Sequence, residues 1–229
     1  MNLEPRLLYR DGLMLVIDKP SGIPVHAGPN GGPNIEDGFE SLMFGLPKRP
    51  HLAHRLDRDT SGCLVLGRHA KALSRLGKLF ESKRVQKTYL AILPIETSGE
   101  GTIDAPLAKV HKWKGWKMKI AESGDEGIQE TITGYKVLAS EGGMSLVEFY
   151  PKTGRTHQIR VHALHQFGAA ILGDTLYGTE EDKTQPRLYL HASSITLPLY
   201  PNKDPVTVSA PLPPEFLAFP VVDKWKSAG

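Results

Sequence analysis

Short apolar runs that end in turn-forming residues constrain the fold of this chain more than any other feature of its sequence. Residues 13–17 (LMLVI) run directly into Asp-Lys-Pro-Ser-Gly, and residues 63–67 (CLVLG) follow a dense polar stretch. Runs of this length that are bounded by turn residues predict buried strands. Residues 87–93 alternate in character until Pro94, which predicts a further strand. A sheet is therefore expected to form the core.

Helical patterns lie between these strand patterns. Apolar residues recur at helical spacing after residue 69, and they predict an amphipathic helix over 69–83 with its basic residues outward: Ala70, Leu73, Leu76 and Phe80. Thr156 is expected to cap a second helix, which Gly168 would end. Strands and helices that alternate along 229 residues predict a single mixed α/β domain over residues 1–229.

Basic residues are concentrated in two segments, although the net charge is only +3. Between Arg68 and Lys87 there are seven basic residues and one acid. The second segment lies in a stretch over 96–130 that is rich in glycine and charge and that we expect to have little core. Its basic arm, at about 108–127, holds lysines interleaved with tryptophans, and a phosphate backbone with exposed bases is the matching partner. A solvated helix face and a flexible arm are the alternative explanation.

The composition bears on the compartment. Cys63 is the only cysteine, so it forms no internal disulfide and implies no oxidising compartment. The first residues lack the continuous apolar stretch of a signal peptide, and the sequence has no run of about 18 apolar residues that could span a membrane. We therefore expect a cytoplasmic protein.

The most unusual stretch is HRLDRDTSG over residues 54–62, which packs two carboxylates, two guanidiniums and two hydroxyls ahead of an apolar strand. Asp57 lies at its centre, and a carboxylate flanked by arginines stays ionised, which suits a nucleophile or a base. A turn in which the arginines only neutralise the aspartates would give the same cluster, since structural ion pairs also produce such patterns.

A second polar stretch, TGRTHQIRVH, covers residues 153–162. On a helix, Arg160 lies one turn from His157 and Leu164, so it can point inward from a partly apolar face. A buried guanidinium requires a carboxylate partner, for which Asp57 is a candidate. Arg160 could instead face solvent or hold the helix against a loop.

The 54–62 stretch resembles the catalytic motif of the RluA family of pseudouridine synthases. Other segments resemble that family in the same order: residues 15–26 (LVIDKPSGIPVH), 87–91 (KTYLA), 103–107 (IDAPL), 153–162 (TGRTHQIRVH), 172–178 (LGDTLYG) and 190–192 (LHA). Together they extend over residues 8–216, nearly the whole chain. One such motif would be weak evidence, whereas the ordered set is strong.

The resemblance implies the pseudouridine synthase fold, a mixed, largely antiparallel sheet flanked by helices and loops, in a short form without an N-terminal RNA-binding domain. It implies an enzyme that isomerises uridine to pseudouridine in structured ribosomal or transfer RNA, with no cofactor, no metal and no obligate protein partner. We expect a monomer.

The resemblance also assigns roles to individual residues. Asp57 matches the catalytic aspartate, and Tyr89 matches the tyrosine that packs against the target base. Arg160 matches the arginine that pairs with the aspartate, and Arg55 matches the arginine that enters the space left by the flipped uridine. From the charge of the arm we expect three lysines to contact the RNA backbone: Lys112, Lys114 and Lys117.

Two other functions fit parts of the sequence. His51, His54 and Asp57 have a three-residue spacing that could present metal ligands from one helix face, as in a metal-dependent hydrolase. Pro50 and the following Thr-Ser-Gly make a helix at that place doubtful. A non-catalytic RNA-binding module is the other alternative, against which the presence of Asp57, Tyr89 and Arg160 argues.

Overall fold

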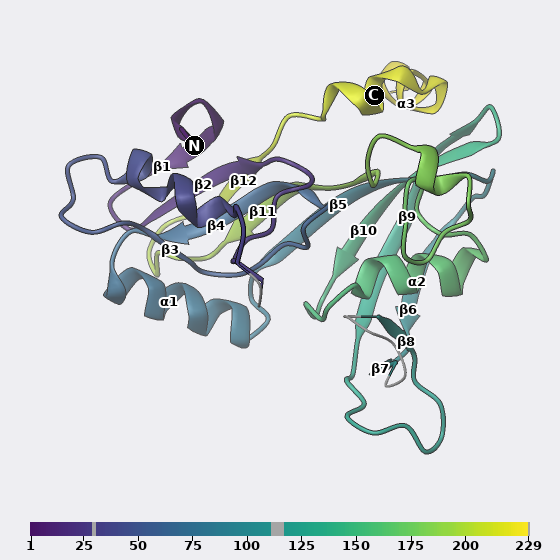
Figure 1. The fold of residues 1–229 in the computed structure, drawn as a ribbon, viewed down its shortest axis with the longest axis horizontal. Helices are drawn as coiled ribbons and strands as arrows, with labels where there is room; N and C mark the ends of the chain where they lie inside the picture. Colours follow the sequence, from purple (N-terminus) through teal and green to yellow (C-terminus); the bar gives the residue numbers. More distant parts are fainter. Residues whose placement is uncertain (29–30, 111–116, 229) are drawn as a thin grey trace. The chain divides into compact units, whose positions relative to one another are not determined.

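The computed structural model describes residues 1–28, 31–110 and 117–228, and it divides the chain into two compact units (Figure 1). Unit 1 comprises Met1–Lys87 and Ala192–Pro211, and unit 2 comprises Thr88–His191 and Leu212–Gly229. No helix in the described ranges is long and apolar enough to cross a membrane. A single catalytic domain over 1–229 stays a prediction.

Unit 1 is built on an antiparallel sheet in which β2 lies between β1 and β4. β3 pairs with β4 and β12 pairs with β11, both antiparallel. The strands are β1 (Leu7–Arg10), β2 (Met14–Lys19), β3 (His51–Leu52), β4 (Ser61–Gly67), β11 (Leu190–Leu197), which begins in unit 2, and β12 (Val206–Ser209). The helices are η1 (Glu4–Arg6), η2 (Ile35–Leu42) and α1 (Ala70–Glu81).

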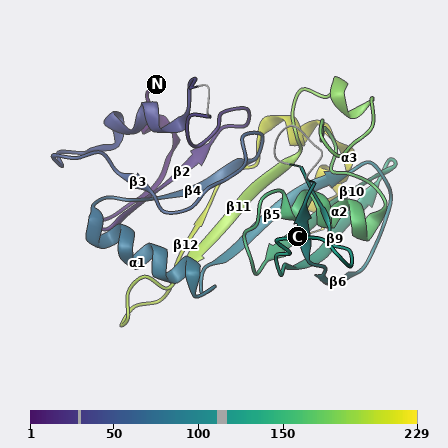
Figure 2. The ribbon, with the colours of Figure 1, turned by 60° about the horizontal axis from the view of Figure 1, so that its bottom comes forward.

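The core of unit 1 explains its apolar runs. Helix α1 covers one face of the sheet (Figure 2), where Leu76 and Leu79 belong to the same cluster as Val16 and Val65. Every residue of β4 is buried, and Leu15 on the neighbouring strand is fully buried. A strand that is covered on both faces has a continuous apolar sequence, whereas a strand with one exposed face alternates between apolar and polar residues. The predicted strands at 13–17 and 63–67 and the predicted helix over 69–83 are confirmed.

The strands of unit 2 pair antiparallel in the order β5-β10-β9-β6, and β7 and β8 form a separate two-stranded ribbon. The strands are β5 (Gln86–Leu93), which begins in unit 1, β6 (Glu100–Asp104), β7 (Leu107–Lys109), β8 (Met118–Ile120), β9 (Ile132–Glu141) and β10 (Met144–Pro151). The helices are α2 (Gln158–Phe167), η3 (Asp182–Thr184), η4 (Pro214–Ala218) and α3 (Pro220–Ser227). The expected mixed fold with a largely antiparallel sheet and flanking helices is confirmed.

The segment 96–130 differs from its prediction. β6 pairs along its full length with β9, and in the ribbon Leu107 and Met118 are buried against Val161 of α2. The prediction of little core was wrong because the partner strand of β6 follows almost thirty residues later, and local composition carries no sign of that pairing.

The ends of α2 were predicted with mixed success. Gly168 ends the helix in the left-handed conformation (φ 68°), as expected, because glycine adopts it without a steric cost. Thr156 is not the cap. The helix begins after His157, which is itself left-handed (φ 55°) and makes no side-chain cap to the helix. His157 is instead engaged with Tyr177, and this tertiary contact outweighs the local preference.

Candidate active site

The loop over residues 54–60, which contains Asp57, follows β3 in unit 1. A buried lysine holds this loop in place. Lys19, at the end of β2, is fully buried, and its Nζ donates to the carbonyl oxygens of Pro20 and Ile23 at 2.7 Å and of Arg58 at 2.9 Å. A buried ammonium requires such acceptors, so its charge ties the loop to the turn after β2. The segment 18–22 (DKPSG) therefore holds the polar loop in place.

Further contacts immobilise the turn around Asp57. Ser21 Oγ donates to the carbonyl of Asp59 at 2.6 Å, and the Thr60 amide donates to the carbonyl of Asp57 at 3.2 Å. Gly62 (φ 106°) lies so close to the next strand that a Cβ would fall 2.2 Å from the carbonyl oxygen of Ala192. The half-buried Asp57 side chain thus projects from a rigid backbone.

The two arginines of the loop have separate positions. Arg58 donates through Nε and Nη2 to both carboxylate oxygens of Asp59, at 2.9 and 3.1 Å. Arg55 is exposed. The neutralising pair that the sequence allowed therefore forms at Asp59, next to Asp57 rather than on it.

His54 serves the packing of unit 1. Its Nε2 accepts the backbone N–H of Val65 at 3.0 Å, and its ring stacks on Phe80 with 4.7 Å between centroids. Burial lowers the pKa of His54 to about 3, and the nearby charge of Lys87 acts in the same direction. The ring is neutral, and its acceptor nitrogen is already occupied.

These contacts count against the metal-dependent hydrolase. His51 lies on strand β3 rather than on a helix, so the three-residue spacing does not bring His51, His54 and Asp57 to one helix face. Nowhere in the described residues do three or more His, Cys, Asp or Glu side chains gather as metal ligands would.

In unit 2, Arg160 is buried on α2, as the sequence indicated, and it has a carboxylate partner. Nε and Nη2 of Arg160 donate to Oδ2 and Oδ1 of Asp174 at 2.7 and 2.6 Å. Asp174 is fully buried, and its Oδ1 also accepts the amides of Leu176 and Tyr177, each at 3.0 Å. The partner that this structure gives Arg160 is therefore Asp174. Asp57 belongs to the other unit, and its pairing with Arg160 stays a prediction.

Tyr177 joins the surroundings of Arg160 to the β7–β8 ribbon. The guanidinium carbon of Arg160 lies 5.1 Å from the centroid of the Tyr177 ring. The Tyr177 hydroxyl accepts the backbone N–H of Met118 at 2.8 Å and lies 2.9 Å from Nδ1 of His157. One aromatic side chain thus connects the ribbon, the start of α2 and the buried arginine.

The loop over residues 172–182, which carries Asp174, has its own scaffold. The carboxylate of Asp182 accepts the amide of Gly173 at 2.9 Å and that of Thr179 at 2.7 Å. Gly178 packs so closely that a Cβ would fall 2.4 Å from the Asp182 carboxylate. The backbone that presents Asp174 is therefore also constrained.

Two buried polar side chains fix α2 against the sheet. Gln158 Nε2 donates to Thr133 Oγ1 at 2.9 Å, and its Oε1 accepts the hydroxyl of Thr153 at 2.7 Å. The fully buried His162 lies 2.8 Å from Thr133 Oγ1 and 3.0 Å from Thr131 Oγ1. Burial lowers the pKa of His162, so its ring is neutral. The glutamine and the histidine of the TGRTHQIRVH motif thus place the helix that carries Arg160.

Tyr89 lies on β5 of unit 2, opposite Phe149 of β10. Its half-buried ring packs against the core cluster that contains Phe149 and Ile159. The residue thus acts as a strand aromatic, and part of its surface is left accessible.

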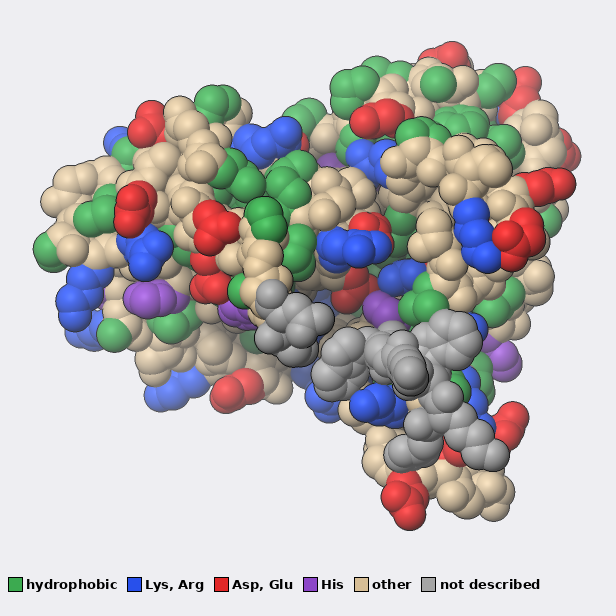
Figure 3. Space-filling model, viewed as in Figure 1, with side chains coloured by type: hydrophobic (Ala, Val, Ile, Leu, Met, Phe, Trp, Pro, Cys, Tyr) green, Lys and Arg blue, Asp and Glu red, His purple; other side chains and the backbone are tan. Residues whose placement is uncertain are grey.

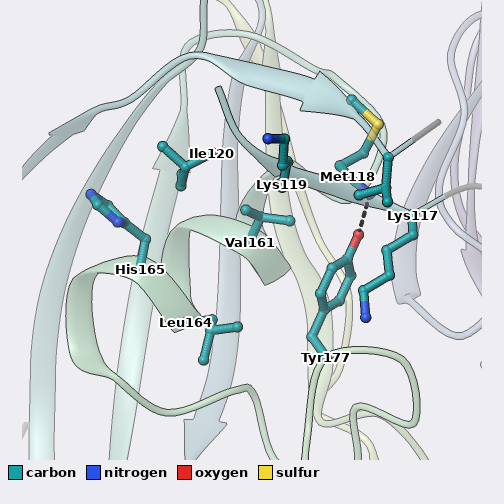
Figure 4. A pocket seen from close by; sticks show the side chains of 9 residues that line it. Lys117, Met118, Lys119, Ile120, Val161, Leu164, His165 and Tyr177 are labelled. Carbon is teal, nitrogen blue, oxygen red and sulfur yellow. Dashed lines mark hydrogen bonds between the residues drawn. The ribbon is translucent and has the colours of Figure 1, made fainter. Parts of the chain in front are cut away.

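A cavity of about 270 Å³ lies between β8 and α2 in unit 2 (Figure 4). Apolar side chains from the two elements form much of its wall, among them Ile120, Val161 and Leu164. Lys117 and Tyr177 close one side, with Lys117 Nζ 5.6 Å from the centroid of the Tyr177 ring. Of the three lysines expected to contact RNA, Lys117 is the described one; Lys112 and Lys114 lie outside the described residues.

Sequence reasoning assigned no role to Asp174, Tyr177 or Lys19. All three lie in segments that carried the family resemblance, but their partners are backbone amides, carbonyls or residues far along the chain. A charged residue directly after an apolar run, as at position 19, was the available signal. The identity of its partners requires the tertiary structure.

The structure thus shows a rigid loop that presents a carboxylate in unit 1, and a buried arginine held by a second carboxylate in unit 2. Residues 13–165 match the family model described as RNA pseudouridylate synthase. The chain belongs to this family, as an RluA-type member, and it is an RNA pseudouridine synthase.

Individual relatives agree with this assignment. The chain is 42% identical over 216 residues to an uncharacterized RNA pseudouridine synthase of Zymomonas mobilis, covering 93% of this chain and 96% of the relative. It is 39% identical over 206 residues to ribosomal large subunit pseudouridine synthase C of Buchnera aphidicola, covering 85% of this chain and 63% of that protein. Human RNA pseudouridylate synthase domain containing 4 has a similar structure, with a TM-score of 0.77 and 28% identity over 94% of this chain and 91% of that chain.

Proposed function

We propose that Asp57 is the catalytic carboxylate of this pseudouridine synthase, that Tyr89 and Arg160 hold the target uridine, and that Arg55 fills the space it leaves in the RNA. The observation that carries the proposal is the rigid 54–60 loop, whose backbone is held by Lys19 and Ser21. A catalytic group must be held within a fraction of an ångström, and such supporting contacts are how proteins achieve it.

The reaction requires only side-chain chemistry. The bond from ribose C1′ to uracil N1 breaks, the uracil rotates, and C1′ joins uracil C5, so substrate and product are isomers. The C5 proton is lost, and N1 gains one. The carboxylate of Asp57 attacks or deprotonates the nucleoside.

The target uridine has to leave the base stack before it can react. Flipping a base costs a few kcal/mol. The accessible face of Tyr89 recovers part of that cost by stacking, on the order of 1–3 kcal/mol. Arg160, held through Nε and Nη2 by Asp174, presents its positive charge in a fixed orientation. A guanidinium that is positioned in advance costs no reorganisation when the reaction occurs.

The substrate that we infer is large-subunit ribosomal RNA. The support is the similarity to ribosomal large subunit pseudouridine synthase C of Buchnera aphidicola. Contacts to the RNA backbone come from Lys112, Lys114 and Lys117 in the basic arm. Replacing these lysines with alanine lowers RNA affinity and the salt dependence of binding.

The test of Asp57 is the Asp57→Asn variant, with the exposed Asp204→Asn of the same unit as the matched control. Pseudouridine is mapped in unmodified transcripts of large-subunit ribosomal RNA and of transfer RNA incubated with each protein. Asp57→Asn forms no product, whereas its RNA binding and melting temperature match the wild type. Asp204→Asn forms product at the wild-type rate.

Each other outcome removes one part of the proposal. Turnover by Asp57→Asn at the wild-type rate removes Asp57 from the chemistry. If pseudouridine forms only in transfer RNA, then transfer RNA and not large-subunit ribosomal RNA is the substrate, and the catalytic role of Asp57 is unaffected. The cytoplasmic location and monomeric state stay predictions, which localisation of a tagged chain and light scattering after size-exclusion chromatography test.

A further inference from the structure

Helix α1 of unit 1 carries a row of exposed cations. Lys71 and Lys78 are seven residues apart, which places them on the same side of the helix about 10.5 Å apart along its axis. Lys83 and Arg84 follow the helix directly and are also exposed. In the space-filling view, basic side chains lie at the surface where Figure 1 places α1 (Figure 3). We call these four residues the α1 cations.

Among the described residues, the α1 cations have no carboxylate partners. In the described ranges, no Asp or Glu side chain forms an ion pair with Lys71, Lys78, Lys83 or Arg84. Neighbouring cations without intramolecular partners repel one another, and an external anion relieves that repulsion.

Two of the α1 cations occupy positions that are unfavourable for lysine. The backbone conformation is unfavourable at Lys83, and the helix dipole is unfavourable at Lys71. Lys83 is left-handed (φ 57°), the conformation that favours glycine after a helix. The amides of Lys83 and Arg84 donate to the carbonyls of Phe80 and Leu79 at 3.1 and 3.0 Å, which is the motif that glycine usually completes. Lys71 lies in the first turn of α1, where the helix dipole disfavours a positive charge and no acid offsets it.

We propose that the α1 cations form a contact surface for the sugar–phosphate backbone of the RNA substrate, in addition to the basic arm of unit 2. The proposal rests on the proposed function for its ligand. A nucleic-acid strand presents one phosphate about every 3.4 Å of helix axis, so a row of this length meets several phosphates. Solubility alone does not require lysine at two unfavourable positions, because other exposed positions would serve it equally well.

The test compares two triple variants that remove the same charge. One changes the surface, Lys71→Gln, Lys78→Gln and Lys83→Gly. The other changes exposed lysines outside α1, Lys48→Gln, Lys136→Gln and Lys226→Gln. The dissociation constant for an unmodified transcript of large-subunit ribosomal RNA is measured from about 50 to 200 mM salt.

The α1 triple variant loses RNA affinity, and its slope of log affinity against log salt becomes shallower by about 2 to 3. The control triple variant keeps the wild-type slope. Product formation in a single turnover at saturating RNA is unchanged in both, because no α1 cation is assigned to the uridine.

Stability separates a binding role from a structural one. Lys83→Gly alone raises the melting temperature, because glycine fits the left-handed position, and yet it lowers RNA affinity. Wild-type salt dependence in the α1 triple variant, or an equal decrease in the control, overturns the proposal. Absence of pseudouridine from every RNA treated with the wild-type protein would overturn the proposed function instead, and the salt slopes would still decide the role of α1.

Discussion

The buried charges of Asp174 and Lys19 each have several hydrogen-bond partners. Asp174 receives two hydrogen bonds from Arg160 and two from backbone amides, and the ammonium of Lys19 meets three carbonyl oxygens. Each charge also holds a segment that we assign to the active site. At this scale, the stability of the fold and the geometry of the site depend on the same side chains.

The Asp174→Asn variant is expected to be strongly destabilised. Removing one partner of a buried ion pair leaves the other charge uncompensated, at about 3–5 kcal/mol of unfolding free energy. Asp59→Asn breaks the more exposed pair with Arg58 and costs at most about 1 kcal/mol. Urea denaturation of both variants measures the difference. Equal losses of unfolding free energy in the two variants would show that burial of the Arg160–Asp174 pair does not increase the cost of breaking it.

Lys19→Met tests whether the buried ammonium positions the 54–60 loop. Methionine has a similar volume, but it leaves three carbonyl oxygens without their donor, which costs on the order of 3 kcal/mol. Turnover at saturating RNA falls as well, because the backbone around Asp57 loosens. The exposed Lys203→Met is the control, with stability and turnover close to the wild type. Full turnover by a folded Lys19→Met protein would contradict the positioning role.

At the scale of elements, the β7–β8 ribbon is the most informative part of unit 2. Two of its apolar residues, Leu107 and Met118, are anchored on Val161 of α2. The Tyr177 hydroxyl adds a hydrogen bond to the backbone of β8. Because α2 also carries Arg160, the ribbon and the arginine share one support.

Tyr177→Phe separates the hydroxyl from the ring. The ring over Arg160 remains, but Met118 loses the acceptor for its amide, so we expect a loss of about 1–2 kcal/mol in stability. RNA affinity falls because Lys117, which directly precedes β8, is less firmly held, whereas turnover at saturating RNA is retained.

Tyr200→Phe is the matched control for this variant. It removes a hydroxyl that donates to Asp11 in unit 1, so it lowers stability similarly and leaves RNA affinity unchanged. Dissociation constants and urea denaturation curves of the two variants provide the comparison. If Tyr177→Phe bound RNA with wild-type affinity, the ribbon would not contribute to RNA binding.

At the scale of the whole molecule, each unit has its own core and a histidine that its surroundings keep neutral. His54 in unit 1 and His162 in unit 2 both have lowered pKa values because of burial. Each is held neutral by a fold that uses ring nitrogens as hydrogen-bond partners. The stability of the molecule therefore depends on pH through both units.

We expect stability to decrease as the pH is lowered below about 6.5, the pKa of an unfolded histidine. Folded His54 stays neutral down to a pKa of about 3, so between these values the unfolded chain binds more protons. The free energy of unfolding then falls by at most about 1.4 kcal/mol per pH unit for this histidine.

The His54→Gln variant isolates that contribution. A glutamine carbonyl can still accept the amide of Val65, but it does not titrate. Unfolding free energies between about pH 6 and pH 4 decrease less steeply in the variant than in the wild type. Parallel pH profiles would contradict the contribution of His54.

Local patterns were enough for much of the fold. The strands at 13–17, 63–67 and 87–93, the helix over 69–83 and the glycine that ends α2 follow from periodicity, steric preference and turn residues. The family followed from ordered motifs. The pairing of β6 with β9, the ribbon core and the left-handed start of α2 did not follow, because each depends on a partner that is distant in the chain.

The sequence by itself determined which segments are apolar, which carry charge and which polar motif precedes a buried strand, since these properties belong to neighbouring residues. Only the tertiary structure decided that Arg160 pairs with Asp174, that Lys19 supports the 54–60 loop and that Tyr177 connects the ribbon to α2. A buried charge takes whichever partner satisfies it at the lowest cost, and that choice depends on distances in space that the order of residues does not encode.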